Sequence, residues 1–250
     1  MSSPEFGLAD AAYRAFRPRY PAALFDAILA AVGPGRDLVI DLGAGTGLST
    51  APLSTHFKRI IAVEPDAAMA RALAGLASNI EADPSSAEDF SAEAESADLV
   101  AAGNCFYWFD GPAVAARIAR WLKPGAPFAA YRYRFPGVTG AAGEIIERED
   151  RVHWDAFRHD RLRDQAYTKR TLQDCPAFAD VSVHEIPGTR HLTPKALAGF
   201  FASSSFASAY ARDIGDADYF TKLADELETA CGPTIESDFS VELVLARKGV

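Results

Sequence analysis

Short apolar runs alternate with amphipathic stretches through the first half of the chain. The runs predict five strands, over 37–42, 59–63, 79–82, 98–102 and 128–133. Helical patterns separate several of them, at about 47–56, 67–76 and 113–122. Pro112 opens the third helix and Lys123-Pro124-Gly125 closes it. Strands separated by about 10–15 helical residues are typical of βαβ units and a parallel sheet.

The second half of the chain does not show this regular alternation of strands and helices. Residues 143–167 predict a long, charged helical region that contains several aromatic residues. Further patterns predict strands over 181–186 and 239–246, and helices over 195–201 and 216–231. The chain shows no repeat, low-complexity tract or linker. We therefore predict one doubly wound α/β domain over 1–250, with an N-terminal helical segment at 8–33 and helical lid segments at roughly 140–172 and 193–232.

The first strand ends in a glycine-rich turn, Val39-Ile40-Asp41-Leu42-Gly43-Ala44-Gly45-Thr46-Gly47. Three glycines at alternate positions let the backbone approach a ligand closely. A dinucleotide fingerprint would need a third glycine where Leu48 stands, and a phosphate-binding P-loop would need a lysine that is absent. The spacing therefore disfavours a nicotinamide dehydrogenase and predicts another kind of nucleoside site.

Composition excludes several classes of partner. The chain has 250 residues, of which 49% are hydrophobic, and a formal net charge of −9. Without a basic stripe we expect no nucleic-acid partner, and without an apolar window of about 20 residues we expect no membrane span. Three cysteines with no C-x-x-C pair predict neither a metal site nor a disulfide framework. The start lacks a signal-peptide pattern, so we expect a cytoplasmic protein.

The stretch from Asp41 to Gly47 resembles motif I of the class I S-adenosylmethionine (SAM)-dependent methyltransferases. Two further segments, 13–21 (Y-R-A-F-R-P-R-Y-P) and 104–110 (N-C-F-Y-W-F-D), resemble a group that includes trans-aconitate methyltransferase-like enzymes. The resemblance covers 13–133 well and is weaker beyond. It implies a Rossmann-like seven-stranded sheet with an antiparallel last strand and helical insertions after strands 5 and 6. It also implies SAM as methyl donor, S-adenosylhomocysteine (SAH) as product, and a small-molecule acceptor.

The resemblance also implies a set of cofactor-binding positions. Glu64, 21 residues after Gly43, would accept hydrogen bonds from the ribose. Pro65 and Met69 would offer apolar surface to the adenine, although Met69 also suits a core. Ser86 stands where many relatives have Asp, and with Asp89 it also resembles a helix capping box. The full set is Tyr13, Arg17, Asp41, Gly43, Ala44, Gly45, Thr46, Gly47, Glu64, Pro65, Met69, Ser86, Ala87, Glu88 and Asn104.

For the acceptor, the resemblance and the strand ends point to Tyr20, Phe106, Trp108 and Arg132, although Trp108 could instead pack under the next helix. Tyr107 stands where many relatives have His, and we predict that it orients the acceptor. A tyrosine with a pKa near 10 is a poor base at neutral pH, so acceptors that need no base are favoured. Residues 132–170 contain nine Arg/Lys and seven Asp/Glu, a mild indication of an acidic or electron-rich acceptor.

These observations predict an enzyme that transfers a methyl group from SAM to an oxygen or nitrogen atom of a small-molecule metabolite. The reaction is an in-line displacement, in which positioning supplies most of the rate enhancement. The alternative is a SAM-binding protein of the same fold with other chemistry or a regulatory role. The oligomeric state stays open.

Overall fold

The computed structural model describes residues 15–133 and 137–250 and divides them into two compact units. The sheet unit comprises 19–133, 164–186 and 241–250, and the helical unit takes the other described residues. Tyr13 lies outside the described residues. Each unit is discontinuous along the chain, because the segments of the helical unit are inserted between elements of the sheet.

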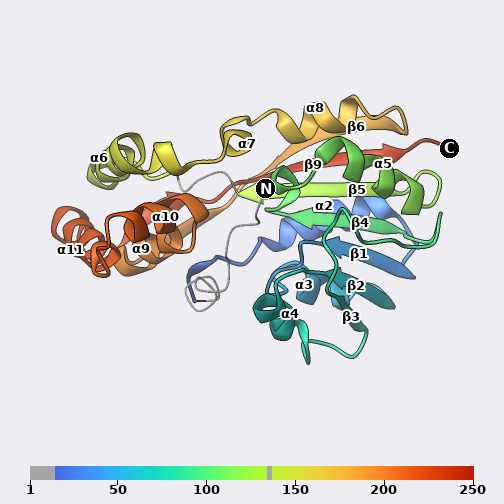
Figure 1. Ribbon diagram of the computed structural model, residues 1–250, viewed down its shortest axis with the longest axis horizontal. Helices are drawn as coiled ribbons and strands as arrows, with labels where there is room; N and C mark the ends of the chain where they lie inside the picture. Colours follow the sequence, from blue (N-terminus) through green and yellow to red (C-terminus); the bar gives the residue numbers. More distant parts are fainter. Residues whose placement is uncertain (1–14, 134–136) are drawn as a thin grey trace. The chain divides into compact units, whose positions relative to one another are not determined.

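A seven-stranded sheet forms the centre of the sheet unit (Figure 1), in the order β3-β2-β1-β4-β5-β9-β6. Neighbours from β3 to β5 pair in parallel, and β9 pairs antiparallel with both β5 and β6. The predicted doubly wound sheet with an antiparallel last strand is therefore confirmed. The strands are β1 Leu38–Leu42, β2 Arg59–Val63, β3 Ile80–Asp83, β4 Leu99–Gly103, β5 Pro127–Tyr133, β6 Phe178–Ile186 and β9 Val241–Lys248.

Helices cover both faces of this sheet. Alternate residues of a strand point to opposite faces, so Ile40 and Phe128 pack with Val114 and Ile118 of α5 in one core. Ala62 lies on the other face and packs with Leu73 of α4. The helices of this unit are α2 Ala22–Val32, α3 Thr50–Ser54, α4 Ala67–Leu73, α5 Gly111–Trp121 and α8 Tyr167–Gln173.

The predicted N-terminal helical segment is interrupted within its described part. Residues 18–21 are not helical, and α2 begins directly after Pro21. Pro18 and Pro21 explain the interruption, because a proline disfavours the helical conformation in the residue before it.

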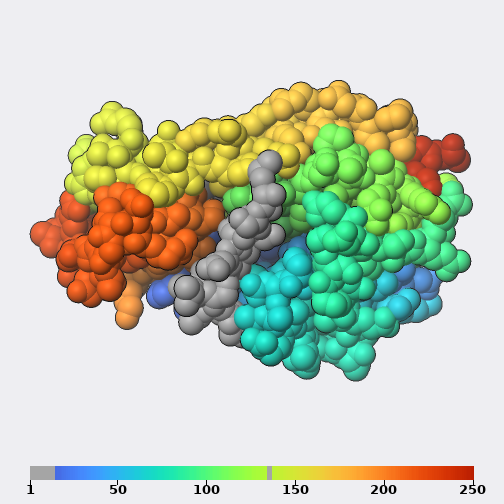
Figure 2. Space-filling model, in the orientation of Figure 1, coloured from blue at the N-terminus to red at the C-terminus, as the bar shows by residue number. Residues whose placement is uncertain are grey.

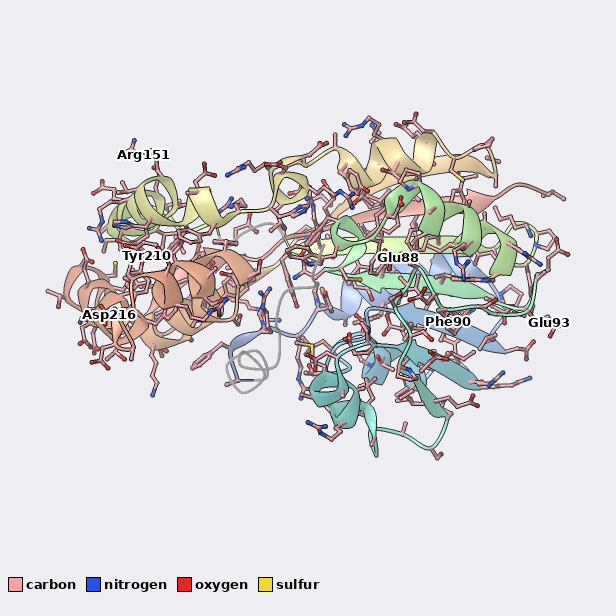
Figure 3. The ribbon with its side chains drawn as sticks, viewed as in Figure 1. Glu88, Phe90, Glu93, Arg151, Tyr210 and Asp216 are labelled. Atoms are coloured by element: carbon pink, nitrogen blue, oxygen red, sulfur yellow. The ribbon has the colours of Figure 1, made fainter. Side chains whose placement is uncertain are left out.

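The connection from β3 to β4 contains no helix and runs along α5 (Figures 1 and 2). Glu88, labelled in Figure 3, accepts a hydrogen bond from the backbone N–H of Asp110 at 2.9 Å. Further along, Arg117 of α5 donates to the carbonyl of Phe90. These contacts fix the segment after β3 against the start of α5.

The helical unit contains α6 Gly140–Glu149, α7 Asp160–Arg163, α9 Pro194–Ala202, α10 Ser205–Asp213 and α11 Tyr219–Cys231. It also contains an antiparallel pair, β7 Thr189–Leu192 with β8 Ile235–Asp238. The sequence pattern predicted the helices of α9 and α11 but missed α10 and both short strands. Strands of four residues with charged side chains, such as Arg190 and Glu236, give little alternation to detect.

The predicted helical region over 143–167 is helical over most of its length, but it is not one regular α-helix. Helix α6 ends at Glu149. A π-helical turn over Asp150–Trp154 follows it directly, and then a 3₁₀ turn over Asp155–Phe157. The π turn includes Trp154, a fully buried residue whose ring lies 4.7 Å from that of Phe201. Its indole N–H donates to the Tyr219 hydroxyl at 2.9 Å, and that hydroxyl donates to Glu149. Tertiary packing of Trp154 thus accompanies the departure from regular α-helix.

Asp98, just before β4, ties three segments of the sheet unit together. Its carboxylate accepts from the backbone N–H groups of Asp37 and Leu38 at 2.8 and 3.0 Å, and from Lys123 Nζ at 2.7 Å. The residue is only 6% exposed. Its removal would leave these donors without a charged acceptor.

We expect Asp98→Ala to lower the free energy of unfolding by about 3 kcal/mol, because buried donors lose their partner. Asp37→Ala is the matched control, since the ion pair of Asp37 with Lys58 is solvent-exposed and should contribute less than about 1 kcal/mol. Urea unfolding of the three proteins measures both values. Equal losses in the two variants would contradict the structural role of Asp98.

Candidate functional site

The loops that follow β1, β2, β3 and β4 meet at one edge of the sheet, because the four strands are parallel. Ligands of open α/β sheets bind at this carboxyl edge. In the loop after β1, Gly43, Gly45 and Gly47 all have positive φ angles, of 62°, 57° and 88°. Residues with side chains rarely adopt this conformation, which explains the alternate glycines of the sequence.

The three glycines differ in what lies in front of them. A Cβ at Gly43 would come within 2.9 Å of the Cys105 side chain, and one at Gly47 within 2.4 Å of Leu76. A Cβ at Gly45 would meet only Met69 Sδ at 3.9 Å and the Gly43 carbonyl at 4.0 Å. Packing within the protein thus leaves no room for a side chain at Gly43 or Gly47. At Gly45, in contrast, a Cβ would make only ordinary van der Waals contacts with the described residues.

Glu64, directly after β2, holds the glycine turn in place. Its Oε2 accepts from the backbone N–H of Gly45 at 2.8 Å, and its Oε1 accepts from that of Asp66 at 2.9 Å. Burial raises the pKa of Glu64, and the two backbone N–H groups act in the opposite direction. Each carboxylate oxygen can accept a second hydrogen bond, so Glu64 keeps capacity for a ligand.

Asp41 lies near the end of β1, on the face opposite to α5, and is 1% exposed. Its Oδ2 accepts from the Thr50 hydroxyl at 2.7 Å, whereas Oδ1 is buried and has no hydrogen-bond partner among the described residues. Burial raises the pKa of Asp41 to about 7, the Thr50 hydrogen bond lowers it, and the charge of Glu64 raises it further. A buried carboxylate with an unpaired oxygen is well suited to accept a donor or a cation.

Two more acidic groups lie close to Asp41. Burial raises the pKa of the Cys105 thiol, and the charges of Asp41 and Glu64 raise it further. Burial likewise raises the pKa of Tyr131, the charge of Asp41 raises it further, and a hydrogen bond with Ser49 lowers it. We call Asp41, Glu64, Cys105 and Tyr131 the acidic cluster. The raised pKa values keep Cys105 and Tyr131 protonated at neutral pH. Only Asp41 and Glu64 can therefore carry negative charge here, and an ionised carboxylate of either would favour a cationic group.

The loop after β4 begins with Asn104, whose φ of 60° is unusual for a residue with a side chain. Its N–H donates to the Tyr131 carbonyl at 2.7 Å. A 3₁₀ turn over Phe106–Trp108 follows. Phe106 is 2% exposed and belongs to the core, whereas Tyr107 and Trp108 are partly exposed, with ring centroids 5.3 Å apart.

The predicted adenine-side residues lie on the neighbouring loops. Pro65 is exposed and Met69 is 5% exposed. Ser86 and Asp89 form the capping-type pair that the sequence also suggested, because the Ser86 hydroxyl bonds to the carboxylate of Asp89 at 2.8 Å and accepts from its N–H at 3.1 Å. Ala87 is buried in the core, and Glu88 contacts the start of α5.

The remaining predicted residues make contacts of their own. Tyr20 is 8% exposed and stacks on Tyr133 at 4.7 Å. Arg17 belongs to the helical unit, where it donates to the hydroxyl and the carbonyl of Ser203 at 2.9 and 3.0 Å. Arg132 forms an ion pair with Glu242 at 3.2 Å.

Sequence reasoning missed several residues of this region. Cys105 was assessed only as one of three unpaired cysteines, and Tyr131 only as part of a strand. Glu242 was also missed, because its strand lies more than a hundred residues beyond β5. The sequence predicted a strand over 239–246, but only the register, which sets Glu242 opposite Arg132, reveals the pair.

Comparisons with known proteins agree with this geometry. A family model described as "Methyltransferase domain" matches residues 40–130. An uncharacterized methyltransferase of Mycobacterium tuberculosis is 31% identical over 207 residues, which cover 82% of this chain and 78% of that protein. A solved structure described as a type II methyltransferase, from Anaeromyxobacter dehalogenans, superimposes with a TM-score of 0.77 at 25% identity, covering 93% of this chain and 98% of that one.

The chain therefore belongs to the class I SAM-dependent methyltransferases. A phosphoethanolamine N-methyltransferase of Haemonchus contortus, solved with SAH and phosphomonomethylethanolamine, shares the fold at a TM-score of 0.55 and 16% identity, over 100% of this chain and 61% of that one.

Within residues 15–133 and 137–250, no helix is long and apolar enough to cross a membrane. The same residues contain no group of three or more His, Cys, Asp or Glu side chains able to hold a metal ion.

The residues present fit the cofactor of this family. No described atom lies closer than 3.9 Å to a Cβ built at Gly45, so the backbone there is less crowded than at Gly43 and Gly47. Oδ1 of Asp41 lacks a donor within the described chain. The acidic cluster complements a cation, and SAM has a sulfonium and an ammonium group. The geometry and the charge of the site are therefore both compatible with SAM.

The raised pKa of Asp41 predicts a stability that falls as pH rises. The carboxyl of the unfolded chain ionises near pH 3.8 and that of the folded chain near 7. Between these values the folded state binds the extra proton, so the free energy of unfolding decreases with pH, by at most about 1.4 kcal/mol per pH unit. Asp41→Asn should flatten this slope between pH 5 and 7, measured by urea unfolding of the ligand-free protein.

Asp37→Asn is the control for this experiment. The exposed Asp37 has a lowered pKa and is ionised in both states above pH 5, so its variant should keep the slope of the parent. An unchanged slope in Asp41→Asn would show that Asp41 does not titrate in this range.

Proposed function

We propose that this methyltransferase transfers the methyl group of SAM to an oxygen or nitrogen atom of a small-molecule metabolite. The open backbone at Gly45, together with the Glu64 carboxylate that orients it, is the observation on which the donor site depends most. Because the acceptor must reach the same edge of the sheet, Tyr107 and Trp108, which are partly exposed there, are the first candidates to contact it.

Each residue of the proposed donor site has a role that follows from its chemistry. The backbone of Gly43–Gly47 would lie along the ligand, and Glu64 would accept hydrogen bonds from its ribose hydroxyls. Pro65 and Met69 would contact the adenine, and the loop of Ser86–Glu88 would lie at its edge. The acidic cluster would stabilise positive charge at the other end of the ligand.

SAM supplies a methyl group that is already activated by its positively charged sulfur. The task of the protein is therefore to align the acceptor atom and exclude water, and orientation alone can contribute about 7–11 kcal/mol to lowering the barrier. The Tyr107 hydroxyl can hold an acceptor oxygen or nitrogen by a hydrogen bond. With a tyrosine rather than a histidine at this position, acceptors that are already deprotonated at neutral pH are favoured.

Gly45→Ala tests the open backbone. We expect the variant to lose about 1–2 kcal/mol of stability because an alanine is strained at a φ of 57°. Its affinity for SAH, measured by isothermal titration calorimetry, should fall by about tenfold or more, because the methyl group would occupy ligand space.

Gly125→Ala is the matched control. Gly125 also has a positive φ, of 74°, and no atom lies within 4 Å of its Cβ position. The control should therefore lose similar stability and keep its SAH affinity. Equal affinities in both variants would contradict the proposed position of the ligand.

Glu64→Ala and Tyr107→Phe should separate binding from turnover. SAH at 100 times its dissociation constant adds about 2.7 kcal/mol of stability to a protein that binds it. We expect Glu64→Ala to abolish most of this stabilisation, whereas Tyr107→Phe keeps it and releases SAH more slowly from SAM in the presence of a metabolite panel. Thermal unfolding and an assay for released SAH provide the two measurements.

Asp66→Ala controls for loss of local structure. Asp66 caps α4 by accepting from Ala68 and Met69, so its removal costs about 1 kcal/mol without removing a ligand contact. This variant should retain the stabilisation by SAH. If Glu64→Ala retained it as well, the ribose assignment would be wrong.

A further inference from the structure

Strand β6 lies at one end of the seven-stranded sheet, beyond β9 (Figure 1), and among the described residues it pairs with β9 alone. It is the longer of the two outer strands, with nine residues against four in β3. Residues 179, 180 and 183–185 are exposed. The strand contains neither proline nor lysine, residues that commonly protect such edges. β6 therefore offers an edge to which a further strand can be added.

One face of β6 continues the core of the sheet unit. Val181 and Val183 lie opposite Ala246 and Val244 of β9, which belong to the core that packs on α5. Val181 packs against this core, whereas Val183 is 45% exposed. Burying Val183 would remove apolar surface from water, which is favourable. The core is thus incompletely covered at its β6 margin.

The other face of β6 is polar. Side chains alternate along a strand, so Asp180, Ser182 and His184 share this face. The Ser182 hydroxyl forms a hydrogen bond with His184 Nε2 at 3.0 Å. Asp180 and His184 are both exposed, and a carboxylate can accept a hydrogen bond from an imidazole N–H. Four strand residues span about 13 Å, so these two side chains cannot pair with each other within one copy.

We propose that β6 pairs with β6 of a second copy of this chain, antiparallel and about a twofold axis at Ser182. This register sets Asp180 opposite the partner's His184 and Val181 opposite the partner's Val183, each twice because the contact is symmetric. Four valines then meet on the core face, and two acid–imidazole pairs form on the polar face. No acid lies opposite another acid. The proposal is independent of the proposed function.

Other registers of the same pairing fit less well. Backbone groups point alternately to the two edges of a strand, so antiparallel pairing of β6 with itself requires an axis at a residue. An axis at Val183 would set Val181 opposite the partner's Glu185. An axis at Val181 would bring His184 to the bulge between Phe178 and Asp180, where the ladder is irregular. The axis at Ser182 matches valine with valine and acid with imidazole.

The outer strand at the other end of this sheet shows the contrary pattern. β3 reads Ile-Glu-Ala-Asp over 80–83. Pairing with itself about Glu81 or Ala82 would set Glu81 opposite the partner's Glu81 or Asp83, and like charges opposite each other destabilise a sheet. Of the two outer strands, only β6 is complementary to its own sequence. This favours a second copy over an unrelated strand as its partner.

The twofold axis stands perpendicular to the sheet, so the parallel strands of the two copies run in opposite directions. Their carboxyl edges, and with them the two candidate donor sites, lie at opposite edges of the joined sheet. Each site stays complete within its own copy. Association through β6 is therefore expected to leave the affinity for SAH unchanged, and failure of either proposal leaves the other standing.

Sedimentation velocity of the whole chain tests the association. Pairing of one strand is small beside the roughly 1,600 Å² of a stable complex, so we expect a reversible dimer with a dissociation constant of about 1–100 μM, measured over about 1–300 μM protein. A monomer at every concentration would overturn the proposal and leave the edge to a strand of a different protein.

Val183→Lys tests the apolar face of the contact. Each lysine would replace one of the four valines, and we expect the dissociation constant of the dimer to rise at least about tenfold. Ala82→Lys is the matched control, because it adds a lysine to the exposed part of β3 and should leave the constant unchanged. Thermal unfolding verifies that both variants fold. A dimer that tolerates Val183→Lys would show that another surface is the interface.

Exchange of the polar pair tests the register. Asp180→Lys and His184→Glu each place an unfavourable pair at two positions, so each should raise the dissociation constant about three- to tenfold. The double variant restores opposite charges across the contact and should return to within about threefold of the parent. A merely structural role of either residue would make the losses add. Additive weakening in the double variant would overturn the axis at Ser182.

Discussion

The carboxylate of Glu64 is the interaction on which the carboxyl edge of the sheet depends. It joins the loop after β1 to the loop after β2 through two backbone N–H groups. A turn with three left-handed residues within five positions is conformationally costly, and a buried carboxylate without partners is costly as well. Each feature offsets the cost of the other, and together they keep the backbone at Gly45 exposed to a ligand.

The alternation of side chains along β5 separates two electrostatic environments. Tyr131 points to the face that contains Asp41, where acidic groups gather and a cation would be stabilised. Arg132 points to the opposite face, where Glu242 balances its charge. Neighbouring residues of one strand therefore lie in different electrostatic surroundings.

Local patterns in the sequence were enough to predict the parallel strands, because apolar runs and the glycine turn are local signals. The seven-stranded sheet and its antiparallel last strand were implied by the family resemblance. The broken helix after α6 was not predictable in this way, since Trp154 departs from the helix to pack on Phe201, a distant residue. For the site, the turn and Glu64 were recognisable from spacing, and their ligand roles stay predictions. The pairing of Arg132 with Glu242 depends on strand register, which no local pattern encodes.

Strand β9 comes from the end of the chain but lies between β5 and β6. During synthesis on the ribosome, β5 therefore emerges with an open edge, and β6 has no neighbour in the sheet until β9 has left the exit tunnel. Exposed edges of this kind promote wrong pairing and aggregation of nascent chains. The parallel half, from β3 to β5, can assemble early, whereas closure of the sheet must wait for β9.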